Sequence, residues 1–169
     1  MKTIIVYYSL DGNTAKAAQE LAKAIGADLC RIEPVKPIVS AGKPTFRTIM
    51  TGGAQVTFGI CPELKEFSTD LSQYERIVLG TPVWAGKCAS FVRTFAKKYA
   101  KRHHLSDKVT AVFTLSGSGD NTGCLADLKK LLPQIGANVS LVDRSHSLSE
   151  ENEKKLNEFA GELLSASDR

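Results

Sequence analysis

Six consecutive residues near the start of the chain carry the side chains best suited to binding an anion. Ser9, Asn13 and Thr14 supply hydroxyl and amide groups, and Gly12 allows the backbone to approach a ligand closely. An apolar run precedes them, and apolar residues at helical spacing follow. A helix that begins here directs unpaired N–H groups at the turn. The segment therefore predicts a phosphate site; the alternative is that Asn13 or Thr14 only caps the helix.

Two later segments carry groups suited to a flat aromatic ligand. Residues 81–87 include the only tryptophan, Trp84, beside Ala85 and Gly86, where bare backbone can meet a ring. Residues 116–121 are small, polar and rich in N–H donors. A phosphate site, an indole and a set of donors describe a site for flavin mononucleotide (FMN) better than one for a sugar phosphate. The alternative is that Trp84 does not stack on a ligand and instead forms part of the hydrophobic core.

Several other chemistries are not indicated. The Lys-containing phosphate loop of nucleoside triphosphatases and the G-x-G-x-x-G of dinucleotide-binding folds are both missing. No pair of cysteines forms a C-x-x-C, so neither a zinc site nor a dithiol motif is expected. The cysteines are interpreted as buried or incidental thiols: Cys30, Cys61, Cys88 and Cys124. No residue is predicted to be a nucleophile, a general base or a metal ligand.

The elements that must position these segments alternate along the chain. Apolar runs predict strands at 3–8, 28–33, 76–80, 108–115 and 138–143. Helical spacing predicts a helix after each strand except the second, with stops at Gly26 and Gly136 and an N-cap at Ser149. This α/β pattern indicates a doubly wound five-stranded parallel sheet with helices on both faces. Ligands bind such sheets beyond the carboxyl ends of the strands, where all three polar segments are expected.

Residues 34–73 form a long crossover rich in glycine and proline. A short helix is expected near Phe46–Met50. Long crossovers are often functional, but a structural cover for one face of the sheet is an equal alternative.

Composition sets the broad class. A chain of 169 residues with 43% hydrophobic content predicts a single domain over residues 1–169. No apolar run reaches membrane-spanning length and no leader precedes the first strand, so a soluble, cytoplasmic protein is expected. The net charge of +4 is scattered, which suits an anionic ligand but predicts neither a nucleic-acid nor a membrane partner. The oligomeric state stays open.

Two motifs resemble the flavodoxin family. SLDGNT after two tyrosines resembles the Ser/Thr-x-Thr-Gly-x-Thr phosphate loop of flavodoxins, and GTPVWAGKCASFVRTF is similar to the flavin-flanking loop and following helix of short-chain members. Gly52-Gly53 and Pro62-Glu63-Leu64 are also similar to the crossover of that family. The resemblance covers residues 3 to about 135 and implies a flavodoxin-like fold with strand order 2-1-3-4-5.

The resemblance also implies a set of FMN-binding residues. The phosphate would be held by Ser9, Asp11, Gly12, Asn13 and Thr14. One side of the isoalloxazine would be flanked by Thr81, Pro82, Val83, Trp84, Ala85 and Gly86. The other side would be bordered by Ser116, Gly117, Gly119 and Asp120.

Three features depart from the family pattern. Asp11 stands where a threonine is usual, so its carboxylate either turns outward or to a backbone N–H, or FMN affinity suffers. The third segment lacks the aromatic that covers the outer flavin face, which is then open or covered from the crossover by Phe46 or Phe58. The chain is basic, whereas classical flavodoxins are acidic. Lys87 is expected either to approach the flavin and raise its potential or to be solvated.

The favoured function is a flavoprotein that transfers electrons through bound FMN. Its partner is either a redox protein or a small-molecule acceptor, and an NAD(P)H-dependent quinone-type oxidoreductase is the alternative within this class. A flavin-free binding module of the same fold is the alternative from another class, motivated by Asp11. A phosphotransfer receiver is the weakest interpretation, because the acidic cluster expected after the first strand is absent.

Overall fold

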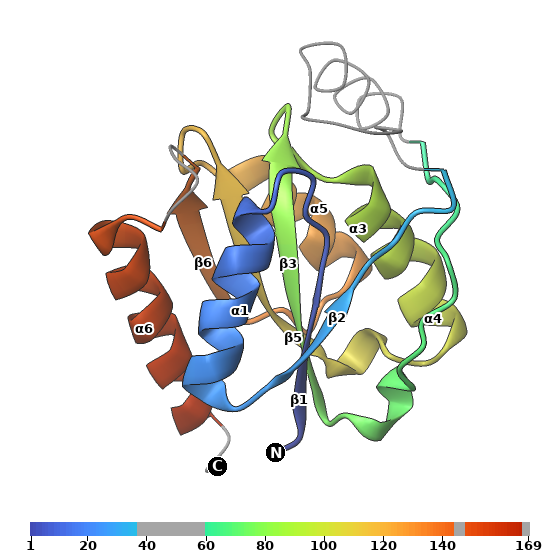
Figure 1. Cartoon of the computed structure of the whole chain (residues 1–169). Helices are drawn as coiled ribbons and strands as arrows, with labels where there is room; N and C mark the ends of the chain where they lie inside the picture. Colours follow the sequence, from blue (N-terminus) through green and yellow to red (C-terminus); the bar gives the residue numbers. More distant parts are fainter. Residues whose placement is uncertain (37–59, 144–147, 167–169) are drawn as a thin grey trace.

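The computed structural model describes residues 1–36, 60–143 and 148–166. Strands and helices alternate along most of this part (Figure 1). The strands are β1 Thr3–Tyr7, β2 Asp28–Arg31, β3 Arg76–Trp84, β4 Lys87–Cys88, β5 Val109–Ser116 and β6 Ala137–Val142. The helices are α1 Asn13–Ile25, α3 Ser90–Thr94, α4 Ala100–Arg102, α5 Thr122–Leu131 and α6 Glu150–Ser165, with a π-helix η2 at Phe95–Tyr99 and 3-10 turns η1 Leu71–Gln73 and η3 Ser106–Lys108.

The strands form one sheet in the order β2-β1-β3-β5-β6, and these five are parallel. This confirms the predicted order of the five parallel strands and the edge position of the strand predicted at 28–33, which ends at Arg31. The short strand β4 is a sixth strand that pairs with β3 in the antiparallel sense. It was not expected from the sequence.

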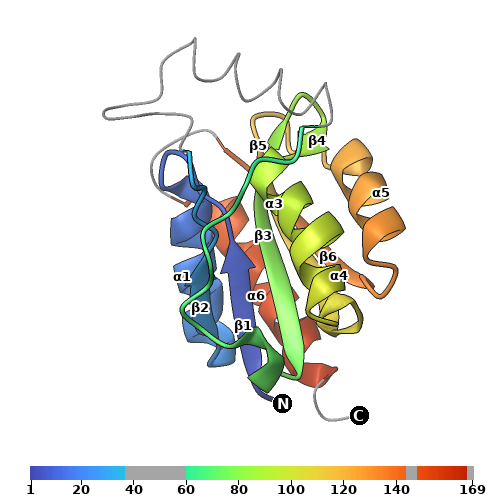
Figure 2. The same cartoon turned by 90° about the vertical axis from the view of Figure 1, so that its right-hand side faces the viewer.

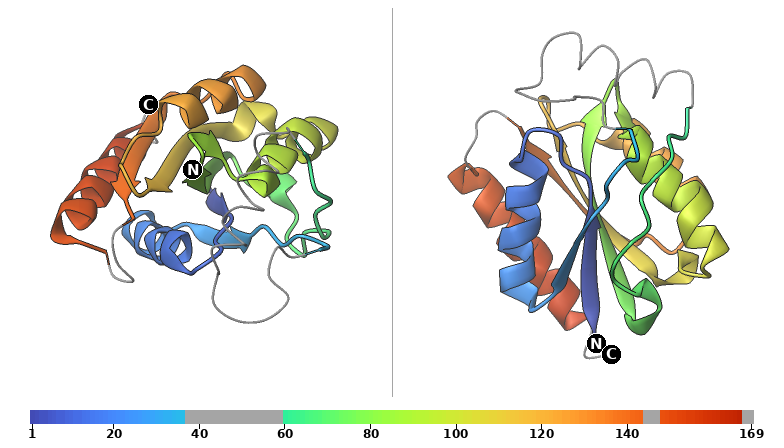
Figure 3. Two further views of the ribbon diagram at one scale, coloured as in Figure 1. Left: turned by 90° about the horizontal axis from the view of Figure 1, so that it is seen from above. Right: turned by 45° about the vertical axis from the view of Figure 1, so that its right-hand side comes forward.

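Two hydrophobic clusters cover the two faces of the sheet. Alternate residues of β1 illustrate the division, because Ile4 and Val6 belong to one cluster while Ile5 and Tyr7 belong to the other. The α3–α4 segment and α5 cover the first face, and α1 and α6 cover the second (Figures 2 and 3). The sheet is therefore buried on both sides, as expected for a doubly wound fold.

The strand register brings the carboxyl ends to one level. Tyr7 lies opposite Gly80, and Gly80 lies opposite Phe113. The segments that follow β1, β3 and β5 consequently leave the sheet side by side, at the upper edge of the molecule in Figure 1. This arrangement is the feature on which the site depends.

Strand β3 is four residues longer than the predicted 76–80. It continues to Trp84, turns at Ala85 and Gly86, and returns as β4, with Val83 opposite Cys88. Ala85 has a φ of 48° and Gly86 a φ of 74°. Two positive φ values in a two-residue connection are the hairpin geometry that fits the natural twist of the strands. The expected loop 81–86 is thus mostly strand.

The caps follow the sequence prediction in two of three cases. Gly26 ends α1 in a left-handed conformation, with a φ of 63°, and Ser149 accepts a hydrogen bond from the Asn152 N–H at the start of α6. The third case is wrong, because α5 ends at Leu131 rather than at Gly136. The N–H of Gly136 instead donates to the Thr110 carbonyl and leads the chain into β6.

The structure describes residues 34–36 and 60–73 of the crossover. Pro34 and Leu64 form an antiparallel bridge, and the partly buried Leu64 and Phe67 pack on the first face of the sheet. This part of the crossover acts as a cover. The helix expected at Phe46–Met50 and the motif at Gly52-Gly53 lie outside the described residues, as does the proposed covering role of Phe46 or Phe58.

Within the described ranges, no helix is both long enough and apolar enough to cross a bilayer.

Replacing Asn152 by Ala is expected to destabilise the fold by about 2 kcal/mol, because two buried hydrogen bonds are lost. The Asn152 side chain is 3% exposed; it accepts from the Val142 N–H and donates to the Val142 carbonyl, at 3.0 and 2.8 Å. It thereby completes the edge strand β6. Urea unfolding measures the effect, with Asn157→Ala on the exposed side of α6 as the matched control. Equal stability of the two variants would contradict this role.

Candidate functional site

The segment between β1 and α1 forms a tight turn at the upper edge of the sheet. Gly12 is the N-cap of α1, with a φ of 98°, and as a glycine it makes no side-chain capping hydrogen bond. The buried Ser9 hydroxyl accepts a hydrogen bond from the Gly12 N–H at 3.1 Å. The alternative in which Asn13 or Thr14 acts as the cap is therefore wrong.

The carboxylate of Asp11 already binds donors of this turn. It accepts hydrogen bonds from the backbone N–H of Asn13 at 3.2 Å and from the Asn13 side-chain amide at 3.1 Å. Of the orientations left open by the sequence, the structure shows the one that turns to a backbone N–H. Asp11 thus occupies two donors that a bound anion would also use.

The next donors of α1 remain available. The N–H groups of Thr14 and Ala15 have no acceptor within the described part of the chain, and neither does the Thr14 hydroxyl. The first turn contains no acidic residue. Two backbone donors and one hydroxyl at a helix N-terminus suit a phosphate.

Three neighbours of this turn were missed by sequence reasoning. The guanidinium of Arg31 donates to the Ser9 carbonyl at 2.9 Å, and Asp143 accepts from the Asn13 side-chain amide at 2.8 Å. The Tyr8 phenol lies within reach of the charges of Arg31 and Asp11, and burial raises its pKa to about 12. The position of Arg31 near this turn could have been predicted from the sequence, because pairing of the first two strands places Arg31 beside Tyr7.

The residues of the second segment divide between the sheet and the hairpin. Thr81 is fully buried, and its hydroxyl accepts from the Ala89 N–H at 3.1 Å and donates to the Pro82 carbonyl. Thr81 therefore holds the base of the hairpin together. Pro82 and Val83 are half-buried, whereas the turn residues Ala85 and Gly86 are exposed.

Trp84 is anchored at the end of β3. Its ring meets the ring of Tyr8 edge-on, with centroids 5.8 Å apart and planes at 89°, and it packs against the core of the first face. The partial core interpretation is thus confirmed. Trp84 is nevertheless only half-buried, so part of the indole remains accessible at the upper edge.

The third segment is held by its own hydrogen bonds. The buried Ser116 hydroxyl donates to the Asp120 carbonyl, and the Asp120 carboxylate accepts from the Thr122 N–H at 2.9 Å, which lowers its pKa. Gly117 is exposed, and Gly119 takes a φ of 78°. The N–H groups of Gly117 and Ser118 have no acceptor within residues 1–36, 60–143 and 148–166.

A buried donor at the end of this segment also lacks a partner. The side-chain nitrogen of Asn121 is shielded from solvent but makes no hydrogen bond to the described residues. Such an orphaned amide is costly unless a ligand or water satisfies it. Sequence reasoning placed Asn121 in the segment but not among the site residues.

Two contacts join the three segments. The Tyr8–Trp84 ring pair connects the first with the second. A Cβ placed on Gly123 in α5 would lie 2.6 Å from the Gly86 carbonyl, so the hairpin turn rests on the bare backbone that follows the third segment. The structure therefore brings the predicted segments together.

Lys87 does not point freely into the site. Its ammonium lies 2.8 Å from the Asp127 carboxylate, which also pairs with Arg93 at 3.2 Å. The two alternatives predicted for Lys87 were approach to the flavin and solvation, and the ion pair with Asp127 was part of neither. Next to it, the thiols of Cys88 and Cys124 are both buried, and the interaction with Cys124 lowers the pKa of Cys88, a pairing that their spacing in the sequence did not reveal.

Comparisons with known proteins agree with this architecture. A family model described as flavodoxin matches residues 2–158. No curated protein matches the chain. A candidate flavoprotein from Bacteroides eggerthii is similar at 24% identity and a TM-score of 0.72, over 96% of this chain and 98% of that one.

Two further solved structures contain flavin. A flavoprotein from Lactobacillus acidophilus in complex with FMN is similar at 23% identity and a TM-score of 0.64, over 82% of this chain and 91% of that one. A flavodoxin from Fusobacterium nucleatum bound to flavin mononucleotide is similar at 15% identity and a TM-score of 0.53, over 98% and 99%. At these identities the solved structures show a shared fold.

Proposed function

Because this chain belongs to the flavodoxin family, we propose that it is an FMN-binding redox protein that transfers electrons through the bound flavin. The observation that carries the proposal is the meeting of three segments at the carboxyl ends of β1, β3 and β5. This edge of the sheet carries donors suited to a phosphate, the accessible part of the Trp84 indole, and the backbone N–H donors of the third segment.

The first segment fits the phosphate of FMN. Within the described part of the chain, the N–H groups of Thr14 and Ala15 and the Thr14 hydroxyl are free to donate. Apart from Gly12 and its chain neighbours, no described residue lies within 4 Å of the place that a Cβ on Gly12 would take. Arg31 adds a positive charge at the same turn. Asp11 opposes the phosphate, so this family member is proposed to bind FMN more weakly than a threonine in that position would allow.

The second and third segments fit the ring system. Trp84 is fixed by Tyr8 and offers its accessible part to one side of an isoalloxazine. Gly117 and Ser118 present N–H donors to the polar edge of the ring, and the orphaned amide of Asn121 is a further donor nearby in the chain. Gly86 and Gly117 leave open space where a side chain would otherwise stand.

Within this proposal the chain binds and orients, and no side chain has to act as nucleophile or base. Bound FMN supplies the capacity to carry one or two electrons. Asp11, Arg31 and Asp143 set the local charge around the phosphate, while the Asp127 carboxylate keeps Lys87 paired. The partner is proposed to be a redox protein or a small-molecule acceptor.

The absorption spectrum of the chain reconstituted with equimolar FMN and passed over a desalting column tests the proposal. Retained absorption at flavin wavelengths is expected. A colourless protein would favour the flavin-free binding module, which is suggested by the Asp11 carboxylate at the turn predicted to bind phosphate. Steady-state oxidation of NAD(P)H by the coloured protein then distinguishes an oxidoreductase, which consumes it, from an electron carrier, which does not.

Replacing Trp84 by Ala is expected to weaken FMN binding by about tenfold, since stacking of one ring on an aromatic side chain contributes roughly 1–3 kcal/mol. Fluorescence quenching of FMN measures the affinity. Trp84→Phe keeps an aromatic plane and is the control, with a smaller expected loss. Equal affinities of wild type and Trp84→Ala would remove Trp84 from the site.

A further inference from the structure

A basic hollow lies beside the hairpin, on the first face of the sheet. It has a volume of about 590 Å³ and is walled by the hairpin, the α3–η2 segment and α5. Its lining consists of Ala85, Lys87, Arg93, Lys97, Asp127, Lys130 and Leu131. We call it the basic hollow.

The charges of the basic hollow do not cancel. Four cationic side chains face a single carboxylate, which leaves a charge of +3 in one concavity of a chain whose net charge is +4. Asp127 is the centre of the group, with Lys87 at 2.8 Å, Arg93 at 3.2 Å and Lys130 at 3.9 Å. The hydrogen bond from Lys87 and the other neighbouring cations hold the pKa of Asp127 below its ordinary value, so the carboxylate is ionised.

Asp127 fixes the positions of Lys87 and Arg93 but offsets only one of the four positive charges. Its side chain is 21% exposed and that of Arg93 is 19% exposed, so this pair is fixed in the wall. The exposed Lys130 makes only a long ion pair with Asp127, and Lys97 makes no ion pair within the described part of the chain. The two lysines are thus available to a ligand, while Arg93 offers the planar donor geometry that suits phosphate oxygens.

From this arrangement we infer that the basic hollow is a binding site for the phosphate or pyrophosphate group of a small nucleotide-like molecule. The volume of about 590 Å³ lies within the range of small-ligand pockets and is the observation that favours a small ligand over an acidic protein. Ala85 and Leu131 provide an apolar wall for the remainder of the ligand. The site is separate from the α1 turn and does not require that FMN be bound.

A titration with pyrophosphate at constant ionic strength, monitored through the backbone amide signals in NMR spectra, tests the inference. Saturable shifts are expected at Ala85, Lys97 and Leu131. The double variant Lys97→Gln/Lys130→Gln is expected to weaken binding by about tenfold, since each removed charge contributes on the order of a few-fold in affinity. Asp127→Asn removes the opposing charge and is expected to strengthen binding.

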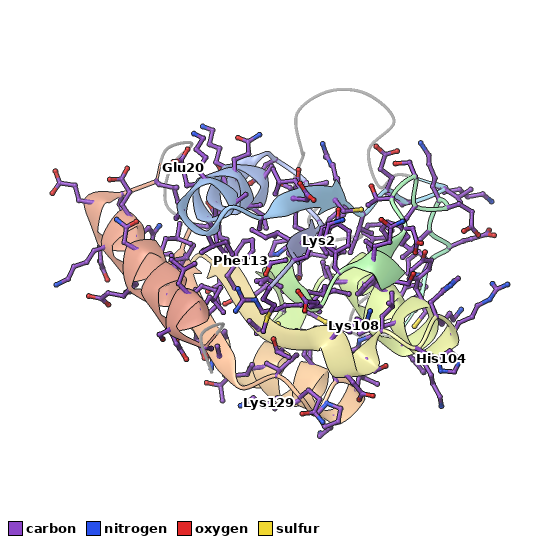
Figure 4. The ribbon with its side chains drawn as sticks, turned by 90° about the horizontal axis from the view of Figure 1, so that it is seen from below. Lys2, Glu20, His104, Lys108, Phe113 and Lys129 are labelled. Carbon is purple, nitrogen blue, oxygen red and sulfur yellow. The ribbon has the colours of Figure 1, made fainter. Side chains whose placement is uncertain are left out.

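Lys129→Gln is the control for the single variant Lys130→Gln, because each removes one charge from α5 and Lys129 is exposed outside the hollow, at the periphery of the molecule in Figure 4. Shifts confined to Gly12–Ala15, or equal weakening by Lys129→Gln, would overturn the inference. Binding of polyglutamate without binding of pyrophosphate would also overturn it, in favour of an acidic protein. A comparison of NADPH with NADH then identifies the group that is bound. Tighter binding of NADPH indicates the phosphate monoester that NADH lacks, whereas equal binding indicates the pyrophosphate that both molecules carry.

Discussion

Replacing Asp11 by Thr is expected to tighten FMN binding by about tenfold or more. Asp11 is an anion placed on the Asn13 donors at the turn proposed to hold a phosphate. Two like charges about 4 Å apart repel by ~4 kcal/mol near a protein surface, and solvent screening at this exposed position leaves a fraction of that value. The substitution also frees the Asn13 N–H and adds a hydroxyl donor.

The dissociation constant of FMN, measured by quenching of flavin fluorescence, gives the result. Asp107→Asn is the control, because it changes the net charge equally but lies in η3, at the opposite end of the strands. Riboflavin, which lacks the phosphate, should not gain affinity. An equal gain for riboflavin, or no gain for FMN, would show that Asp11 does not face the phosphate.

Replacing Gly80 by Ala is expected to destabilise the fold by about 3 kcal/mol, which is the upper range for overpacking a rigid core. A Cβ at this position would lie 2.3 Å from Phe113 Cζ and 2.8 Å from Tyr7 Cβ. The Tyr7 atom is fixed by the backbone of β1, and Phe113 is fully buried in the interior, as Figure 4 shows. Neither neighbour has room to withdraw.

Urea unfolding measures this effect, and Gly161→Ala provides the contrast. Gly161 lies in α6 with open space around it, so alanine there is expected to stabilise the protein by up to ~1 kcal/mol through helix propensity. If Gly80→Ala unfolds at the same urea concentration as the wild type, the close approach of β3 to Phe113 is not tight.

The arrangement of strands was predictable because each strand has its own local signal. Continuous apolar runs at 3–8, 76–80 and 108–115 require burial on both faces, and the intervening helices require parallel neighbours. The meeting of the three polar segments followed from the same reasoning, since polar residues after parallel strands share one edge of the sheet.

The hairpin was not predictable in this way. Its turn uses Ala85 at a positive φ, a conformation for which alanine gives no signal, whereas asparagine or aspartate followed by glycine would have done so. The strand was therefore predicted to end at Gly80. The extension matters because it presents Trp84 at the end of the sheet and places Ala85 at the edge of both the proposed flavin site and the basic hollow.

Long-range partners were also beyond sequence reasoning. Lys87 pairs with Asp127, Asn13 with Asp143, and Cys88 with Cys124, each across a distance in the chain that only the folded sheet closes. Residue type predicted that Lys87 carries a charge, but not that a carboxylate on α5 holds it.

The central claim is that three segments bind one FMN at the same time, and a backbone amide NMR titration with FMN tests it most directly. We expect saturable shifts at Thr14 and Ala15, at Trp84 to Gly86, and at Gly117 and Ser118, all reaching their end point at one equivalent. Shifts in a single segment, or none at all, would contradict the claim.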